Sequence, residues 1–239
     1  MVRGLALVAC AIALSAASPG IHKVVRDSAD LEFSYEWPAE AVAIPALDLR
    51  FYHDARRKLA EARKDAADDT RPSRKHQISQ QWTTAGMSPR ILSLRGDMGW
   101  DTGGAHPNHG TEALLWDRRL GRAVSADRLF AARGQFSSLT RDSYCGKLDA
   151  ERRVRREGEG PGLIIADDPF DKCPTYAELA IYLSDENRNG RFDRIVFVAS
   201  PYVAGPYVEG EYEIALPLTA RLIAAMRPEY RSSFEAQRQ

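Results

Sequence analysis

Apolar and polar residues alternate along Leu31–Pro38 (LEFSYEWP), as they do in a strand with one buried face. A helical pattern follows between Ile44 and Gln77. Pro45 favours a helix start, and Pro72 lies past the helix end. The residues at helical spacing in this segment are Leu49, Tyr52, Arg56, Leu59 and Ala60.

The middle of the chain mixes strand and helix patterns. Gln77–Trp100 predicts two antiparallel strands around a turn at Met87–Pro89, and Thr111–Asp117 predicts a further strand. Asp127–Leu139 and Leu148–Arg156 predict two helices, of which the second is strongly basic.

The last third contains three β-rich runs, Leu179–Ser184, Arg194–Ser200 and Glu211–Thr219, and a closing helix over Thr219–Tyr230. Helices interrupt the strands without regular β–α alternation. We therefore predict an α+β fold with antiparallel sheets and packed helices.

Composition excludes one class of partner. Lysine plus arginine and aspartate plus glutamate balance at 33 each over 239 residues, so the chain has no overall positive charge that would predict a nucleic-acid partner.

The N-terminus predicts export. A basic start, an apolar run at Leu5–Leu14 and small residues at Ser15–Ser18 are typical of a secretory signal peptide. We expect cleavage near Ala17, and a periplasmic or secreted protein with no membrane span. In an alternative interpretation, Leu7–Cys10 (LVAC) is a lipoprotein box and Cys10 is acylated.

Two cysteines remain after the predicted cleavage. An even number of cysteines in an oxidising compartment favours a disulfide between Cys145 and Cys173. The rival interpretations are a two-cysteine metal site and a catalytic thiol. No histidine lies near either cysteine in the sequence, and no base for a thiol is visible.

The segment Asp185–Asp193 (DENRNGRFD) partly matches a calcium loop. Asp185, Asn187, Asn189 and Asp193 stand at loop positions that carry ligands, but Val196 stands where an EF-hand places its glutamate. We favour a polar hairpin turn in which Asn189-Gly190 supplies positive φ, with calcium binding as the alternative.

The segment WDTGGAHPNHG places Asp101, His106 and His109 close together in sequence. Gly103, Gly104 and Pro107 exclude the continuous helix on which a His-x-x-His pair commonly binds a metal. We favour a tight turn, in which His106 packs its ring and Asn108 caps the backbone. A ligand-binding role and a metal site formed by Asp101, His106 and His109 are the alternatives.

Several stretches together resemble one family. FSYEWP, ILSLRGDMGWDTGGAHPN, SADRLF and RIVFVASPYVAGPYVEGEYEIALPLTARL are similar to the PdaC/RsiV-like pair of domains of unknown function. The resemblance implies an extracytoplasmic α+β protein of two small modules. We expect a signal peptide at residues 1–17, an N-terminal module at 18–112 and a C-terminal module at 113–239.

Relatives in this family include peptidoglycan deacetylases and anti-sigma factors whose outer part binds lysozyme. This sequence contains no deacetylase catalytic domain, and it has neither the membrane helix nor the sigma-binding segment of an anti-sigma factor. Neither activity therefore carries over.

We expect a non-catalytic envelope protein without a cofactor that binds a cell-wall glycan or an envelope protein such as a lysozyme-like enzyme. A metal-dependent envelope hydrolase and a structural envelope protein are the alternatives. The candidate binding residues are Trp100, His106, Asn108, His109, Tyr202 and Tyr207, because aromatic side chains suit both sugar rings and protein hot spots.

Overall fold

The computed structural model describes residues 20–70, 74–157 and 169–237. The expected signal peptide and Cys10 lie outside the described residues. Within the described part of the chain, no helix is long and apolar enough to cross a membrane.

The first half of the chain forms a six-stranded sheet in the order β1-β2-β3-β4-β5-β6. Its pairs are antiparallel except β2 with β3, which run parallel because the crossover helix α2 joins them. The sequence predicted antiparallel sheets, and the parallel pair of β2 and β3 departs from that prediction. The strands are β1 (His22–Asp27), β2 (Leu31–Trp37), β3 (His76–Met87), β4 (Ile91–Asp101), β5 (Asn108–Asp117) and β6 (Arg122–Val124).

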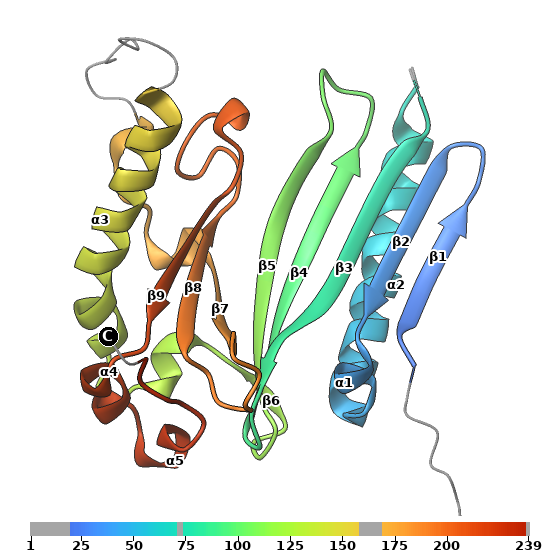
Figure 1. Cartoon of the computed structure of the whole chain (residues 1–239). Helices are drawn as coiled ribbons and strands as arrows, with labels where there is room; N and C mark the ends of the chain where they lie inside the picture. Colours follow the sequence, from blue (N-terminus) through green and yellow to red (C-terminus); the bar gives the residue numbers. More distant parts are fainter. Residues whose placement is uncertain (1–19, 71–73, 158–168, 238–239) are drawn as a thin grey trace, which may run out of the picture.

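Helix α2 (Pro45–Asp68) begins at the predicted proline and covers one face of this sheet, with the short helix α1 (Ala39–Val42) before it (Figure 1). Of the apolar residues predicted at helical spacing, Leu59 is buried, whereas Leu49 and Tyr52 are exposed. The buried stripe has the same period on a different face of the helix, and it packs against Phe33, Trp37 and their neighbours. It consists of Leu47, Phe51, Ala55, Leu59, Ala62 and Ala66.

The second half forms a three-stranded antiparallel sheet of β7 (Ala180–Ser184), β8 (Arg194–Ala199) and β9 (Tyr212–Pro217). The single helix α3 (Gln135–Glu157) packs on it, preceded by the short turn Ala126–Leu129. The prediction of two separate helices here was wrong.

The closing helix is split into α4 (Ala220–Ala225) and α5 (Pro228–Arg231). Arg227 precedes Pro228 and has an extended ψ of 138°, because the proline ring disfavours a helical residue before it.

The two sheets pack between α2 and α3, so that the helices lie on the outer sides of the molecule (Figure 1). Val196, Val198 and Tyr182 meet Ala85 and Ala113 between the sheets. The Leu183 amide also donates to Ser93 Oγ over 2.9 Å. The expected module boundary, between residues 112 and 113, falls inside β5.

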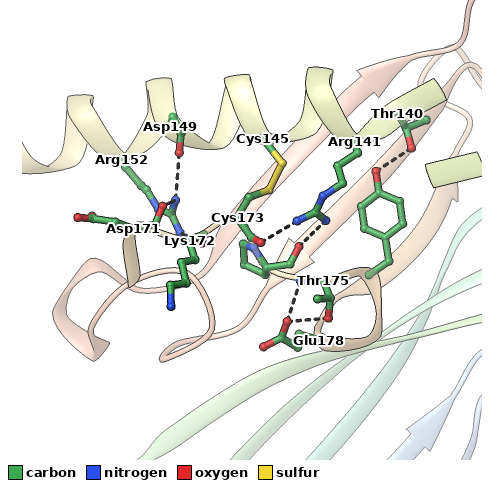
Figure 2. The surroundings of a disulfide bond; sticks show 12 residues. Thr140, Arg141, Cys145, Asp149, Arg152, Asp171, Lys172, Cys173, Thr175 and Glu178 are labelled. Atoms are coloured by element: carbon green, nitrogen blue, oxygen red, sulfur yellow. Dashed lines mark hydrogen bonds and ion pairs between the residues drawn. A yellow bond between two sulfur atoms is a disulfide. The ribbon is translucent and has the colours of Figure 1, made fainter. Parts of the chain in front are cut away.

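The predicted disulfide is confirmed. Cys145 and Cys173 are bonded with their Cα atoms 5.6 Å apart, and the bridge joins α3 to the segment that leads into β7 (Figure 2).

Candidate functional site

The segment WDTGGAHPNHG is the turn between β4 and β5. Gly103 has φ of 87°, which permits the reversal, and its amide donates to the Asp101 carboxylate over 3.1 Å. Asn108 does not cap this turn. It is the first residue of β5 and lies opposite Trp100 on β4.

Four of the six candidate binding residues meet in space, and we call His106, His109, Tyr202 and Tyr207 the aromatic cluster. The ring of His106 stacks on that of Tyr207 at 3.9 Å, and the Tyr207 hydroxyl donates to the Pro107 carbonyl over 2.6 Å. The ring centroids of His109 and Tyr202 lie 5.9 and 5.8 Å from that of Tyr207. The β4–β5 turn and the β8–β9 connection, distant in sequence, thus form one surface.

Trp100 and Asn108 do not belong to this cluster. Residues that face each other across a strand pair project to the same side of the sheet, and successive residues alternate. Trp100 and Asn108 therefore project to the face opposite His109. Trp100 is partly exposed there, on the side covered by α2.

Tyr202 is held in an uncommon backbone conformation. Its φ is 70°, in the left-handed region that a bulky side chain rarely occupies, and such residues cost about 1–3 kcal/mol. Its amide donates to the Gly205 carbonyl over 3.0 Å, and its side chain is 54% exposed. This strained backbone places the tyrosine hydroxyl 3.4 Å from Nε2 of His106.

Three arginines near the end of α3 hold the connection that carries the two tyrosines. Arg152 is buried and donates to the Ala204 carbonyl over 2.9 Å, and Arg155 donates to the carbonyls of Glu209 and Glu211. Arg156 pairs with the Glu209 carboxylate over 2.8 Å. The basic run predicted in this helix therefore anchors a loop.

Close packing reinforces this anchor. A Cβ at Gly205 would lie 2.1 Å from Oε2 of Glu209, so any larger residue would have to displace this carboxylate from its partners. The same carboxylate accepts a hydrogen bond from the Tyr212 hydroxyl. Burial and this hydrogen bond raise the pKa of Tyr212 to about 12, so its hydroxyl remains a donor at neutral pH.

Two of the three residues of the alternative metal site, Asp101 and His106, engage other groups. Asp101 pairs with Arg74 over 3.0 Å besides capping Gly103, and His106 Nδ1 lies 3.0 Å from the Pro107 carbonyl. Among residues 20–70, 74–157 and 169–237, no three histidine, cysteine or acidic side chains are arranged to hold a metal ion.

The loop between β7 and β8 is a hairpin turn held by hydrogen bonds between its own residues. The Asp185 carboxylate accepts hydrogen bonds from the amides of Asn189 and Gly190, and Asp193 is buried and accepts one from Glu186. The positive φ angles belong to Arg188 (57°) and Gly190 (82°). The prediction that Asn189-Gly190 supplies positive φ is therefore confirmed for Gly190 and wrong for Asn189.

Asn187, the fourth residue of the alternative calcium set, also makes contacts within the protein. Its side-chain oxygen accepts from the Asn189 amide over 3.1 Å, and its side-chain nitrogen donates to Glu235 near the C-terminus.

A groove of about 1220 Å³ lies beside β5, and no sequence pattern predicted it. One wall is formed by residues 50–58 of α2, and the other by the start of α3 together with residues 175–179. Residues 111–115 of β5 lie between the walls. Thr111 lines the groove and is two positions from His109, so the groove and the aromatic cluster adjoin along one strand.

The disulfide holds the second wall in place (Figure 2). Arg141 of α3 donates to the carbonyls of Cys173 and Pro174 over 2.9 and 3.0 Å, and Thr140 bonds the Tyr176 hydroxyl over 2.8 Å. One disulfide and three hydrogen bonds thus tie residues 173–176 to α3.

Comparison with known proteins identifies the fold. No protein-family model matches the chain, and no curated protein matches it in sequence. A DUF3298 family protein from Pseudomonas aeruginosa PAO1 is similar in structure, with a TM-score of 0.58 and 14% identity over 91% of this chain and 97% of that one. A member of the same family from Bacteroides fragilis NCTC 9343 is also similar in structure, with a TM-score of 0.54 and 17% identity. The match covers 91% of this chain and 98% of that one.

At these identities the likeness concerns the fold, and it agrees with the resemblance to a PdaC/RsiV-like domain of unknown function. The chain has the fold of the DUF3298 proteins.

Proposed function

We propose that this chain is an exported, non-catalytic binding protein of the cell envelope, and that its aromatic cluster binds a cell-wall glycan. The observation that carries the proposal is Tyr202. Its side chain is half exposed although its backbone is strained, and folding alone gives no reason to maintain that combination.

The chemistry of the cluster suits a sugar. An aromatic ring offers an apolar face to the C–H groups of a pyranose, while polar atoms beside it bind hydroxyl groups. The Tyr202 hydroxyl and the His106 ring lie together, and His109 is exposed and makes no hydrogen bond within the described part of the chain. Aromatic ring faces, hydrogen-bond donors and hydrogen-bond acceptors are therefore available on one surface.

A protein ligand, such as a lysozyme-like envelope enzyme, is the second candidate. It is favoured by Val208, which is 79% exposed directly beside Tyr207. An exposed aliphatic side chain next to aromatic rings is typical of a protein interface and contributes little to sugar binding.

The test is cosedimentation of the mature, oxidised chain with purified peptidoglycan. Tyr202→Ala removes one exposed ring and should weaken retention by about two- to tenfold, since stacking on an aromatic side chain contributes roughly 0.5–1.5 kcal/mol. Tyr52→Ala is the matched control, because Tyr52 is similarly exposed but lies on α2.

Equal retention of Tyr202→Ala and wild type would exclude the cluster as the glycan site. If wild type is not retained on peptidoglycan but binds a lysozyme-like enzyme, and Val208→Ser reduces that binding, the protein ligand is favoured.

A further inference from the structure

We propose that the groove beside β5 is a second binding site, which takes an extended peptide segment that carries both acidic and basic side chains. This inference concerns surfaces other than the aromatic cluster, and it holds whatever ligand that cluster binds.

The size of the groove favours a chain-like ligand. Pockets for small molecules typically enclose about 300–1,000 Å³. The groove exceeds this range at about 1220 Å³, and five successive residues of β5, Thr111–Leu115, line it between the two walls. A single small ligand would leave part of it empty.

The groove offers main-chain hydrogen bonds. On the side of β5 away from β4, only Leu115–Asp117 pair with another strand, β6. The Thr111 amide on that side donates to Ser200 Oγ over 3.0 Å. In an antiparallel strand, the backbone groups of residues two positions apart point to the same side. Ala113 therefore presents its amide and carbonyl to the side away from β4, as Thr111 does, and the described residues supply no strand partner for it there.

An open strand edge is the group of donors and acceptors that an extended peptide uses to bind a sheet. Because Ala113 lines the groove, a peptide lying there meets this edge.

Both walls carry charged side chains, and some of these form no ion pair within the described part of the chain. On the α2 wall, Arg57 and Lys58 pair with acidic residues, whereas Arg50 makes no ion pair or hydrogen bond within the described part of the chain. On the other wall, Glu178 accepts bonds from Thr175 alone.

Asp127 lies on the same wall as Glu178 and accepts only the Gly134 amide. Neither carboxylate forms an ion pair among the residues that the structure describes, although the charge of Arg141 on the same wall helps to lower the pKa of Glu178. A ligand that places a carboxylate near Arg50 and a cation near Glu178 and Asp127 complements both walls.

The site is preorganised, which reduces the entropy that a ligand must overcome. The α2 wall belongs to a helix of 24 residues packed on the sheet. The other wall is fixed to α3 by the Cys145–Cys173 bond and by Arg141 (Figure 2).

The experiment uses isotope-labelled, oxidised chain and pools of random hexapeptides of fixed charge composition: mixed, acidic, basic and uncharged. We expect the mixed pool at about 1 mM to shift the amide signals of Ala113 and its groove neighbours most strongly. Arg50→Gln and Glu178→Gln should each weaken binding by about two- to fivefold, as for an exposed ion pair.

Arg56→Gln is the control, because Arg56 is an exposed arginine on the same helix that pairs with none of the described residues and does not line the groove. Reduction of the disulfide should weaken binding as well. The proposal is overturned if the mixed pool shifts no groove signal, if the uncharged pool binds equally well, or if Arg56→Gln weakens binding as much as Arg50→Gln. No glycan is present, so failure of the glycan proposal does not affect this result.

Discussion

Asp117 forms a buried ionic centre at the end of β5, and its replacement provides the sharpest test of how the two halves of the protein are joined. The carboxylate is fully buried and accepts bonds from Arg90 Nη2 at 3.0 Å and from the Tyr230 hydroxyl at 2.8 Å. Its other oxygen accepts the amides of Arg119 and Leu120 at 2.9 and 3.0 Å. Tyr230 belongs to α5, so this centre ties the first sheet to the C-terminal helices.

We expect Asp117→Asn to lower the free energy of unfolding by about 3–5 kcal/mol, the usual cost of removing one partner of a buried ion pair. The shape is preserved, but the new amide group would direct donors at Arg90 and Tyr230, which are donors themselves. Urea unfolding followed by tryptophan fluorescence measures the change. With a slope of about 2 kcal/mol per M, the midpoint should fall by roughly 1.5–2.5 M.

The effect should depend on pH. Burial alone would raise the pKa of Asp117, but hydrogen bonds from Leu120, Tyr230 and Arg90 outweigh it and hold this pKa below its ordinary value. A lowered pKa in the folded state stabilises the protein above the unfolded value of about 3.9, and this stabilisation is lost as the pH falls through the folded pKa. The difference between wild type and Asp117→Asn should therefore be constant near neutral pH and shrink in acid.

Asp97→Asn is the control. Asp97 pairs with Arg95 over 2.8 Å, but its side chain is 48% exposed, so its loss should cost at most about 1 kcal/mol. If the two substitutions cost the same at neutral pH, or if the Asp117 effect is unchanged at low pH, the account of a buried ionic centre is refuted.

Three further predictions concern the covalent and backbone constraints. Replacing Cys145 and Cys173 by serine together should lower the stability measured by urea unfolding by about 3.6 kcal/mol, the chain-entropy value for a loop of this length, and no loss would show that the reduced chain is equally constrained. Gly205→Ala should lower the melting temperature, because overpacking typically costs about 1–3 kcal/mol, whereas Gly104→Ala, whose Cβ would meet nothing within 4 Å, should not. Tyr202→Gly should change the stability measured by urea unfolding by less than about 1 kcal/mol, since relief of strain offsets lost contacts, and a larger loss would mean that the tyrosine is structural.

Local patterns predicted much of the fold. Strands with one buried face, such as β2, alternate strictly, and α2 starts at Pro45 because proline suits the first turn of a helix. Strand β1 was not predicted, since it lies at the sheet edge and its residues are mostly exposed, so no alternation marks it.

The candidate site was predicted only in part for a related reason. His106 and Tyr207 were both chosen as candidates from the sequence, yet their stacking depends on the packing of two distant turns. The groove has no local signal at all, because α2, β5 and the segment before β7 contribute residues from 50 to 181 of the chain. Sequence periodicity identifies elements, whereas a groove arises from how those elements are placed.

Helix α3 contributes to both candidate sites. Its first turns supply Phe136 and Arg141 to the groove, its middle carries Cys145, and Arg152–Arg156 near its end hold the tyrosine-bearing connection. Proteins open in cooperative units rather than residue by residue, and a helix packed along its length opens as one such unit. Local unfolding of α3 therefore removes the groove wall and the support of the aromatic cluster together, so neither site can persist in a partly opened state that has lost this helix.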